Sequence, residues 1–113
     1  MEAQRESRLF VRYPVVFLGR HGVGEGKLVN LSMGGCAIES GAAVRRGTLL
    51  TLRMHLPSLS QPIAVDQAVV TWTAGDDFGV QFLSLGTRDE ARLSQLITGL
   101  QQDIRETHST EAA

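Results

Sequence analysis

The sequence predicts an all-β core, a small six-stranded antiparallel β-barrel, followed by one C-terminal helix. Three observations support this fold class. Apolar and polar residues alternate over much of the middle of the chain, as they do in strands with one buried face. Glycine, asparagine and aspartate separate these runs at short intervals. After residue 86, the apolar residues recur with the period of a helix.

The first half of the chain predicts three strands. Residues 15–18 are apolar on both sides of the first strand, and residues 28–32 and 36–39 form the next two, divided by Gly34-Gly35. The segment from Gly22 to Gly26 has glycine at every second position, so we predict that it is the turn between the first two strands. It opens no helix and lacks a following GK[ST], which argues against a phosphate-binding loop.

The second half predicts three more strands. Residues 50–56 show the clearest alternation, and residues 78–82 show a second clean apolar face. Between them, residues 63–73 are rich in β-branched side chains, and their alternation slips near Gln67 and Ala68, which predicts a bulge. Residues 75–77 predict a hairpin turn. The apolar face of the 50–56 strand consists of Leu50, Leu52, Met54 and Leu56.

A helix is predicted after these strands. Thr87 and Glu90 have the spacing of a capping box, with Thr87 as the N-cap. An apolar stripe follows, which predicts that the helix packs on the barrel or closes one end of it. The stripe consists of Leu93, Leu96, Ile97, Leu100 and Ile104. The residues after Ile104 are polar and are expected to fray.

Composition narrows the functional class. The 113 residues predict one domain, and a net charge of −1 argues against binding of a nucleic acid polymer, so any anion must be held by a local positive cluster. The single cysteine, Cys36, excludes an internal disulfide. No apolar run approaches the length of a membrane span and no signal peptide is visible, so we expect a cytoplasmic protein without membrane insertion. Gln101, Gln102 and Asp103 offer no dimer seam on the helix, and we expect a monomer.

Two short motifs remain. Arg8 and Arg12 lie four residues apart just before the first strand, and Asn30 and Ser32 precede the Gly34-Gly35 turn at the end of the second. Alone, the first motif is explained by solvated charges and the second by a polar turn. Found together, in this order and at this spacing in a sequence that predicts a barrel, the two motifs indicate a binding site more strongly than either does alone.

The two motifs resemble the signature of the PilZ domain family, an RxxxR motif followed by a (D/N)xSxxG motif. The strand ending in Trp72 and the 78–82 stretch also resemble the family pattern, so the resemblance runs from about residue 8 to residue 104. It implies a PilZ-like split barrel that binds the second messenger cyclic di-GMP, without a cofactor and without catalytic activity. Arg8 and Arg12 fill the first motif, and Asn30, Ser32 and Gly35 fill the second.

The chemistry of these residues agrees with that implied ligand. An arginine fork donates two parallel hydrogen bonds to a guanine edge, and its flat face stacks on purines. Asn30 both donates and accepts, Ser32 offers a hydroxyl, and Gly34 and Gly35 let backbone N–H groups approach a ligand. Trp72 is either a stacking wall or a core residue. The predicted ligand-binding residues are Arg8, Arg12, Asn30, Ser32, Gly34, Gly35, Trp72 and Gly79.

The resemblance also implies a mechanism and a domain division. Residues 1–12 are expected to form a flexible segment carrying RxxxR, residues 13–104 the barrel and helix, and residues 105–113 a disordered tail. Ligand would order the first segment and so present a surface to an effector protein, which the sequence does not identify. Many family members have an arginine where this chain has Ser7, which leaves one bound nucleotide or an intercalated pair open; we favour one.

Two other functions are compatible with a small barrel. A PilZ-like scaffold that binds protein but no nucleotide is the main alternative, and the intact motif residues argue against it. A small barrel enzyme is the other. Ser32 has no evident base nearby in the sequence, which disfavours nucleophilic catalysis. The three histidines, His21, His55 and His108, lie in separate segments, which disfavours a metal site.

Overall fold

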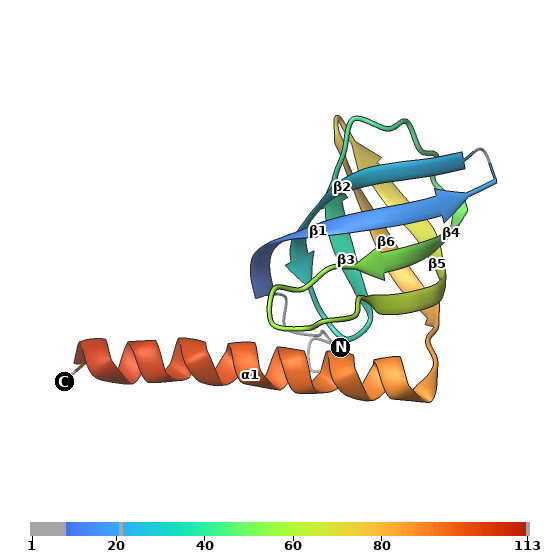
Figure 1. Ribbon diagram of the computed structural model, residues 1–113. Coiled ribbons are helices and arrows are strands. Elements are labelled where there is room, and N and C mark those ends of the chain that lie inside the picture. The colour runs from blue at the N-terminus through green and yellow to red at the C-terminus, as the bar shows by residue number, and fades with distance from the viewer. Residues whose placement is uncertain (1–8, 21, 113) are drawn as a thin grey trace, which may run out of the picture.

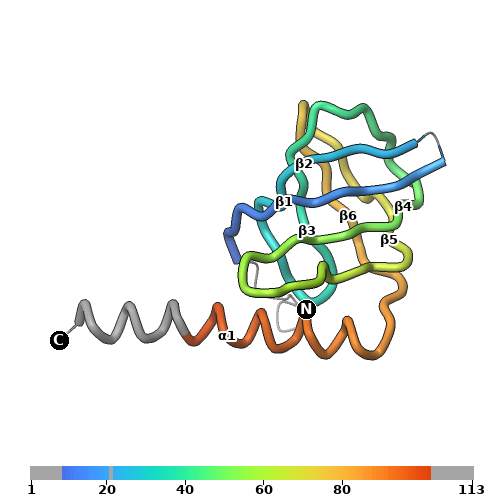
Figure 2. The backbone as a smooth tube through the Cα atoms, viewed as in Figure 1, coloured from blue at the N-terminus to red at the C-terminus, as the bar shows by residue number. Residues whose placement is uncertain are grey.

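The computed structural model describes residues 9–20 and 22–112, with side chains to residue 102 (Figures 1 and 2). Antiparallel strands close into a barrel in the order β1-β2-β3-β6-β5-β4, and one helix follows, which confirms the predicted fold class. The elements are β1 Leu9–Gly19, β2 Gly22–Leu31, β3 Gly35–Glu39, β4 Leu49–Met54, β5 Ile63–Ala74, β6 Asp77–Ser84 and α1 Thr87–Ala112.

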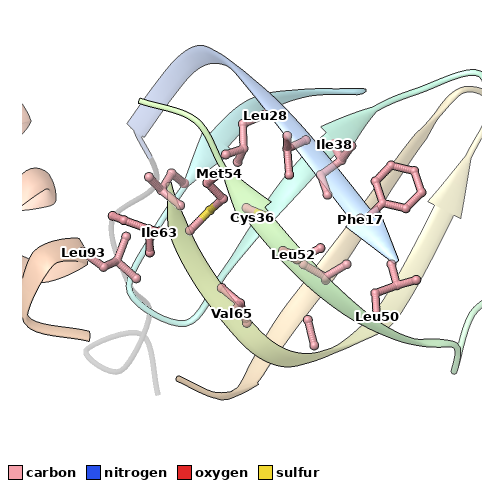
Figure 3. Packing of buried hydrophobic residues seen from close by; sticks show 14 of the residues in the cluster. Phe17, Leu28, Cys36, Ile38, Leu50, Leu52, Met54, Ile63, Val65 and Leu93 are labelled. Carbon is pink, nitrogen blue, oxygen red and sulfur yellow. The ribbon is translucent and has the colours of Figure 1, made fainter. Parts of the chain in front are cut away.

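The inward positions of the alternating strands fill the barrel. The predicted face of residues 50–56 is buried at every second position, which confirms that alternation. Phe17 of β1 and Phe78 of β6 meet edge to face, with ring centroids 5.3 Å apart. Figure 3 shows these apolar side chains converging from strands on all sides, with Leu93 reaching in from the helix toward Ile63. The core therefore lies inside the barrel, and the outer face of the barrel is available for other roles.

The predicted turn over Gly22–Gly26 is wrong. All five residues belong to β2, and Gly19 already pairs with Gly22 across a much tighter connection. A Cβ on Gly24 would lie 2.4 Å from the Phe17 ring, and a Cβ on Gly26 would lie 2.4 Å from the carbonyl oxygen of Glu39. Gly24 and Gly26 therefore mark strand positions that have no room for a side chain.

Two other irregularities were predicted correctly. The pairing of β5 with β6 shifts register between Gln67 and Ala68, which confirms the bulge expected there. Gly75 joins β5 to β6 with a φ of 61°, a left-handed conformation that glycine adopts without strain, which confirms the hairpin turn.

Helix α1 runs beneath one end of the barrel (Figure 1) and packs against β5 and β1. Leu93 and Ile97 are buried, as the stripe predicted. The first helical bond runs from the Glu90 N–H to the Gly86 carbonyl, so Gly86 is the N-cap and the prediction of Thr87 was one residue late. The backbone continues as helix to Ala112, where a disordered tail was expected, because residues 105–112 contain no proline or glycine to end it.

Arg92 fastens this helix to the barrel. Its guanidinium donates to the Asp89 carboxylate at 2.7 Å and to the Pro62 carbonyl at 3.2 Å, and it also contacts the Gln61 carbonyl. The Arg92 and Asp89 side chains are only 20% and 23% exposed, so water competes weakly for these bonds. One side chain thus joins α1 to the loop that precedes β5.

Replacing Arg92 with alanine should lower the free energy of unfolding by about 1–3 kcal/mol, because charged hydrogen bonds are lost and two loop carbonyls lose their donor. Urea unfolding of the variant measures this change. Arg88→Ala is the matched control, since Arg88 is exposed on the same helix. If both variants unfold like the parent, Arg92 does not fasten the helix.

Candidate functional site

Five residues on five adjacent strands form one row on the outside of the barrel, which we call the outer row. Each pairs with the next: Phe10 with Asn30, Asn30 with Ala37, Ala37 with Gly79, and Gly79 with Trp72. Cross-strand partners share one face of a sheet. On β1, β2, β3 and β6, each residue of the row has a core residue next to it along the strand, so the row faces outward there, and on β5 Trp72 is itself exposed. These core neighbours include Leu9, Leu31, Cys36 and Val80.

Small residues form the floor of the row, and Trp72 covers part of it. A Cβ on Gly79 would lie 2.0 Å from Nε1 and 2.4 Å from Cε2 of Trp72, so the indole lies directly over this glycine. Trp72 itself is 42% exposed, which excludes the core alternative that the sequence left open. The predicted pair Trp72 and Gly79 is thus brought together, with part of the indole left accessible to a ligand.

Arg12 lies beside the row. It belongs to β1, which begins at Leu9, so residues 9–12 are part of the barrel, although the sequence placed them in an N-terminal segment. Its guanidinium lies 3.6 Å from the Glu39 carboxylate, and the two side chains are 66% and 51% exposed. An ion pair this exposed is weak, so a better anionic partner can displace it. Arg8 and Ser7 lie outside the described residues.

The turn between β2 and β3 is held by hydrogen bonds to its own backbone. The Ser32 N–H and hydroxyl both donate to the Gly35 carbonyl, at 2.9 and 3.2 Å, and Ser32 is only 1% exposed. The Phe82 N–H donates to the Gly34 carbonyl at 2.8 Å, which ties the turn to β6. In this structure the Ser32 hydroxyl stabilises the turn, and its direct contact with a ligand stays a prediction.

Gly35 is required for a reason that the sequence did not reveal. A Cβ at this position would lie 2.3 Å from the Val80 carbonyl oxygen. Neither Gly34 nor Gly35 has a positive φ, so close approach of β3 to β6, and not an unusual backbone conformation, explains the second of these glycines. The turn therefore fixes the end of β2. It thereby also fixes the position of Asn30, the half-buried residue that β2 contributes to the outer row.

The structure thus gathers Arg12, Asn30, Gly79 and Trp72 on one outer face and places Ser32, Gly34 and Gly35 in the adjoining turn. Sequence reasoning missed Phe10, Ala37 and Glu39. Alternation within residues 36–39 held the signal for the last two, since Cys36 and Ile38 point into the core.

A cleft elsewhere contains none of these residues. It has a volume of about 570 Å³ at the opposite end of the barrel, near the β1–β2 connection. Its lining includes Phe17, Arg20, Val23, Gly24, Arg45 and Leu50. Across the part of the chain that the structure describes, no three His, Cys, Asp or Glu side chains converge as metal ligands would. Within the described residues, the helix of this protein is not long and apolar enough to cross a bilayer.

Comparison with known families decides the classification. The family model described as PilZ domain matches residues 2–99. This chain belongs to the PilZ domain family. That match includes both motifs, every strand and the packed turns of α1. No protein of curated function matches the PilZ domain described here.

Solved structures show the same fold. The PilZ domain of CeSA from a cellulose-synthesizing bacterium has a TM-score of 0.65 at 20% identity, with 84% of this chain and 98% of that chain covered. The PilZ domain with c-di-GMP of YcgR from Escherichia coli gives 0.73 at 15% identity, covering 94% and 97%. The inhibitor of motility MotI/DgrA from Bacillus subtilis gives 0.68 at 20% identity, covering 94% of this chain and 52% of that chain. At these identities the likeness concerns the fold.

Proposed function

We propose that this PilZ domain is a receptor for cyclic di-GMP, which it binds on the outer face of the barrel. The observation that carries the proposal is the convergence of Arg12, Asn30 and Trp72 on one face, to which they come from β1, β2 and β5. Family membership supports it, as does the fold shared with a YcgR PilZ domain that was solved with c-di-GMP.

Each residue has a chemical role in this proposal. The exposed Arg12 guanidinium can form a bidentate pair with a guanine edge or bind a phosphate. Asn30 supplies a donor and an acceptor to the same ligand. Trp72 offers a partly exposed apolar wall, and Gly79 lets its indole lie flat against the sheet.

The output of the receptor is proposed to be another protein. Among the described residues of the outer row, none is a nucleophile set beside a base, which favours binding without turnover. We propose that ligand draws the segment ahead of β1, which carries Arg8, onto the outer face and so creates a surface for an effector. Amide NMR tests this step: unchanged dynamics of the N-terminal amides on saturation would exclude it.

Isothermal titration of the purified chain with cyclic di-GMP tests the receptor function, with GTP and cyclic di-AMP as controls. We expect saturable binding of cyclic di-GMP alone, with a stoichiometry that distinguishes one nucleotide from a pair. Absence of heat, together with an unchanged amide spectrum, would favour the nucleotide-independent scaffold. Recovery of the nucleotide intact after incubation would support a receptor over a hydrolase.

Replacing Glu39 with glutamine should tighten binding of cyclic di-GMP by up to about fivefold, because the ligand no longer competes with a carboxylate for Arg12. Removing the negative charge also reduces repulsion of the phosphates. The dissociation constant from titration measures the change.

Glu25→Gln is the control for net charge, since Glu25 is exposed on β2 and lies nearer the distant end of that strand. If Glu39→Gln weakens binding, or if both variants tighten it equally, the local competition is refuted.

A further inference from the structure

Phe10 is the most exposed of the large apolar side chains in the described part of the chain, at 89%. Its neighbours Leu9 and Val11 pack against the core, so the alternation of β1 directs Phe10 outward. A single exposed apolar residue needs no explanation by itself. The position of Phe10 in the barrel, however, gives it a specific set of neighbours.

Phe10 forms one end of the outer row and Trp72 forms the other. It pairs directly with Asn30, one strand spacing of about 4.8 Å away. It also lies on the same side of β1 as Arg12, since both residues are exposed while Val11 between them packs against the core. An aromatic face, an arginine fork and a carboxamide thus border the same small area of the outer surface.

We propose that Phe10 is a base-stacking residue of this site and that its ring covers the face of one guanine of the ligand. This inference rests on the proposed cyclic di-GMP function and adds a contact at a position of the RxxxR motif that the motif leaves unspecified. Arg12 and Asn30 can satisfy only the edge of a planar base, whereas a base held at the surface also has a π-face to cover. Phe10 lies where that face becomes available, and stacking would shield its ring from water.

The proposal predicts how substitutions of Phe10 rank in their affinity for cyclic di-GMP. Alanine scanning of base-stacking aromatics gives about 1–3 kcal/mol per base, so Phe10→Ala should weaken cyclic di-GMP binding by about 5- to 150-fold. Phe10→Tyr should bind like the parent, because it keeps the aromatic face. Phe10→Leu should bind close to the alanine variant, because it keeps apolar volume but has no π-face.

Isothermal titration of the full chain with cyclic di-GMP measures all three variants. Leu18→Ala is the matched control, since Leu18 is exposed on the same outer face at the far end of β1. Proton NMR of the bound ligand adds a direct readout. A guanine H8 signal should move upfield through the ring current in the parent and in Phe10→Tyr, and this shift should be reduced in Phe10→Leu.

The outcomes separate this inference from the function beneath it. Loss of affinity in Phe10→Ala and Phe10→Leu, with Phe10→Tyr and Leu18→Ala near the parent, supports stacking. If the parent binds cyclic di-GMP and Phe10→Ala binds within twofold of it, the stacking inference is overturned while the receptor function stands. If the parent does not bind cyclic di-GMP, both are overturned. Thermal unfolding of each variant shows that the barrel is intact in the comparison.

Discussion

Replacing Arg12 with alanine should weaken binding of cyclic di-GMP by about 5- to 150-fold and leave the barrel folded. A bidentate arginine–guanine pair is worth about 1–3 kcal/mol of discrimination, which gives that range of affinity. The barrel should survive because the Arg12 side chain is 66% exposed and its pair with Glu39 is an exposed, weak one. Titration gives the affinity, and urea unfolding gives the stability.

Two further variants sharpen this test. Arg12→Lys keeps the positive charge but lacks the planar fork, so it should bind more weakly than the parent if Arg12 contacts a base edge. If a phosphate is the partner instead, lysine should restore most of the affinity. Arg53→Ala removes an equal charge from the exposed face of β4 and should leave binding unchanged. Parental affinity in Arg12→Ala would place the ligand away from this face.

The barrel was predictable from the sequence because its alternation is local. Residues 50–56 and 78–82 show which positions point inward without reference to any other strand. The glycines of residues 22–26 were misread because their cause is tertiary. Gly24 faces Phe17, and Gly26 faces the backbone of Glu39, and neither contact is visible until β1, β2 and β3 are aligned.

The same difference between local and tertiary causes separates the site residues that were predictable from the sequence from those that were not. Arg12 and Asn30 were predicted because they belong to motifs of fixed spacing. Phe10 was not, although it lies inside the first motif, because its role depends on the register that places it opposite Asn30. That register shifts between Phe10 and Tyr13 and again between Leu28 and Asn30. A one-residue slip sends a side chain to the other face of a sheet, so such shifts limit prediction from alternation alone.

Adding one methyl group to Gly35 should both destabilise the barrel and weaken ligand binding. A Cβ at this position would lie 2.3 Å from the carbonyl oxygen of Val80, and since that atom belongs to the backbone of β6, no side-chain rotation relieves the clash. Strands β3 and β6 must separate, and overpacking of this kind costs about 1–3 kcal/mol. Urea unfolding of Gly35→Ala measures the loss of stability.

The effect on binding follows from the same displacement. The Gly35 carbonyl accepts both bonds from Ser32, so moving it loosens the turn that ends β2 and shifts Asn30 relative to the outer row. We therefore expect Gly35→Ala to lose affinity for cyclic di-GMP under conditions where it is fully folded. Gly41→Ala is the matched control, because a Cβ there meets nothing within 4 Å and the backbone has no positive φ. That variant should keep its affinity and be at least as stable as the parent, since alanine restricts the unfolded chain. Equal behaviour of the two variants would mean that the spacing of β3 and β6 does not position the site.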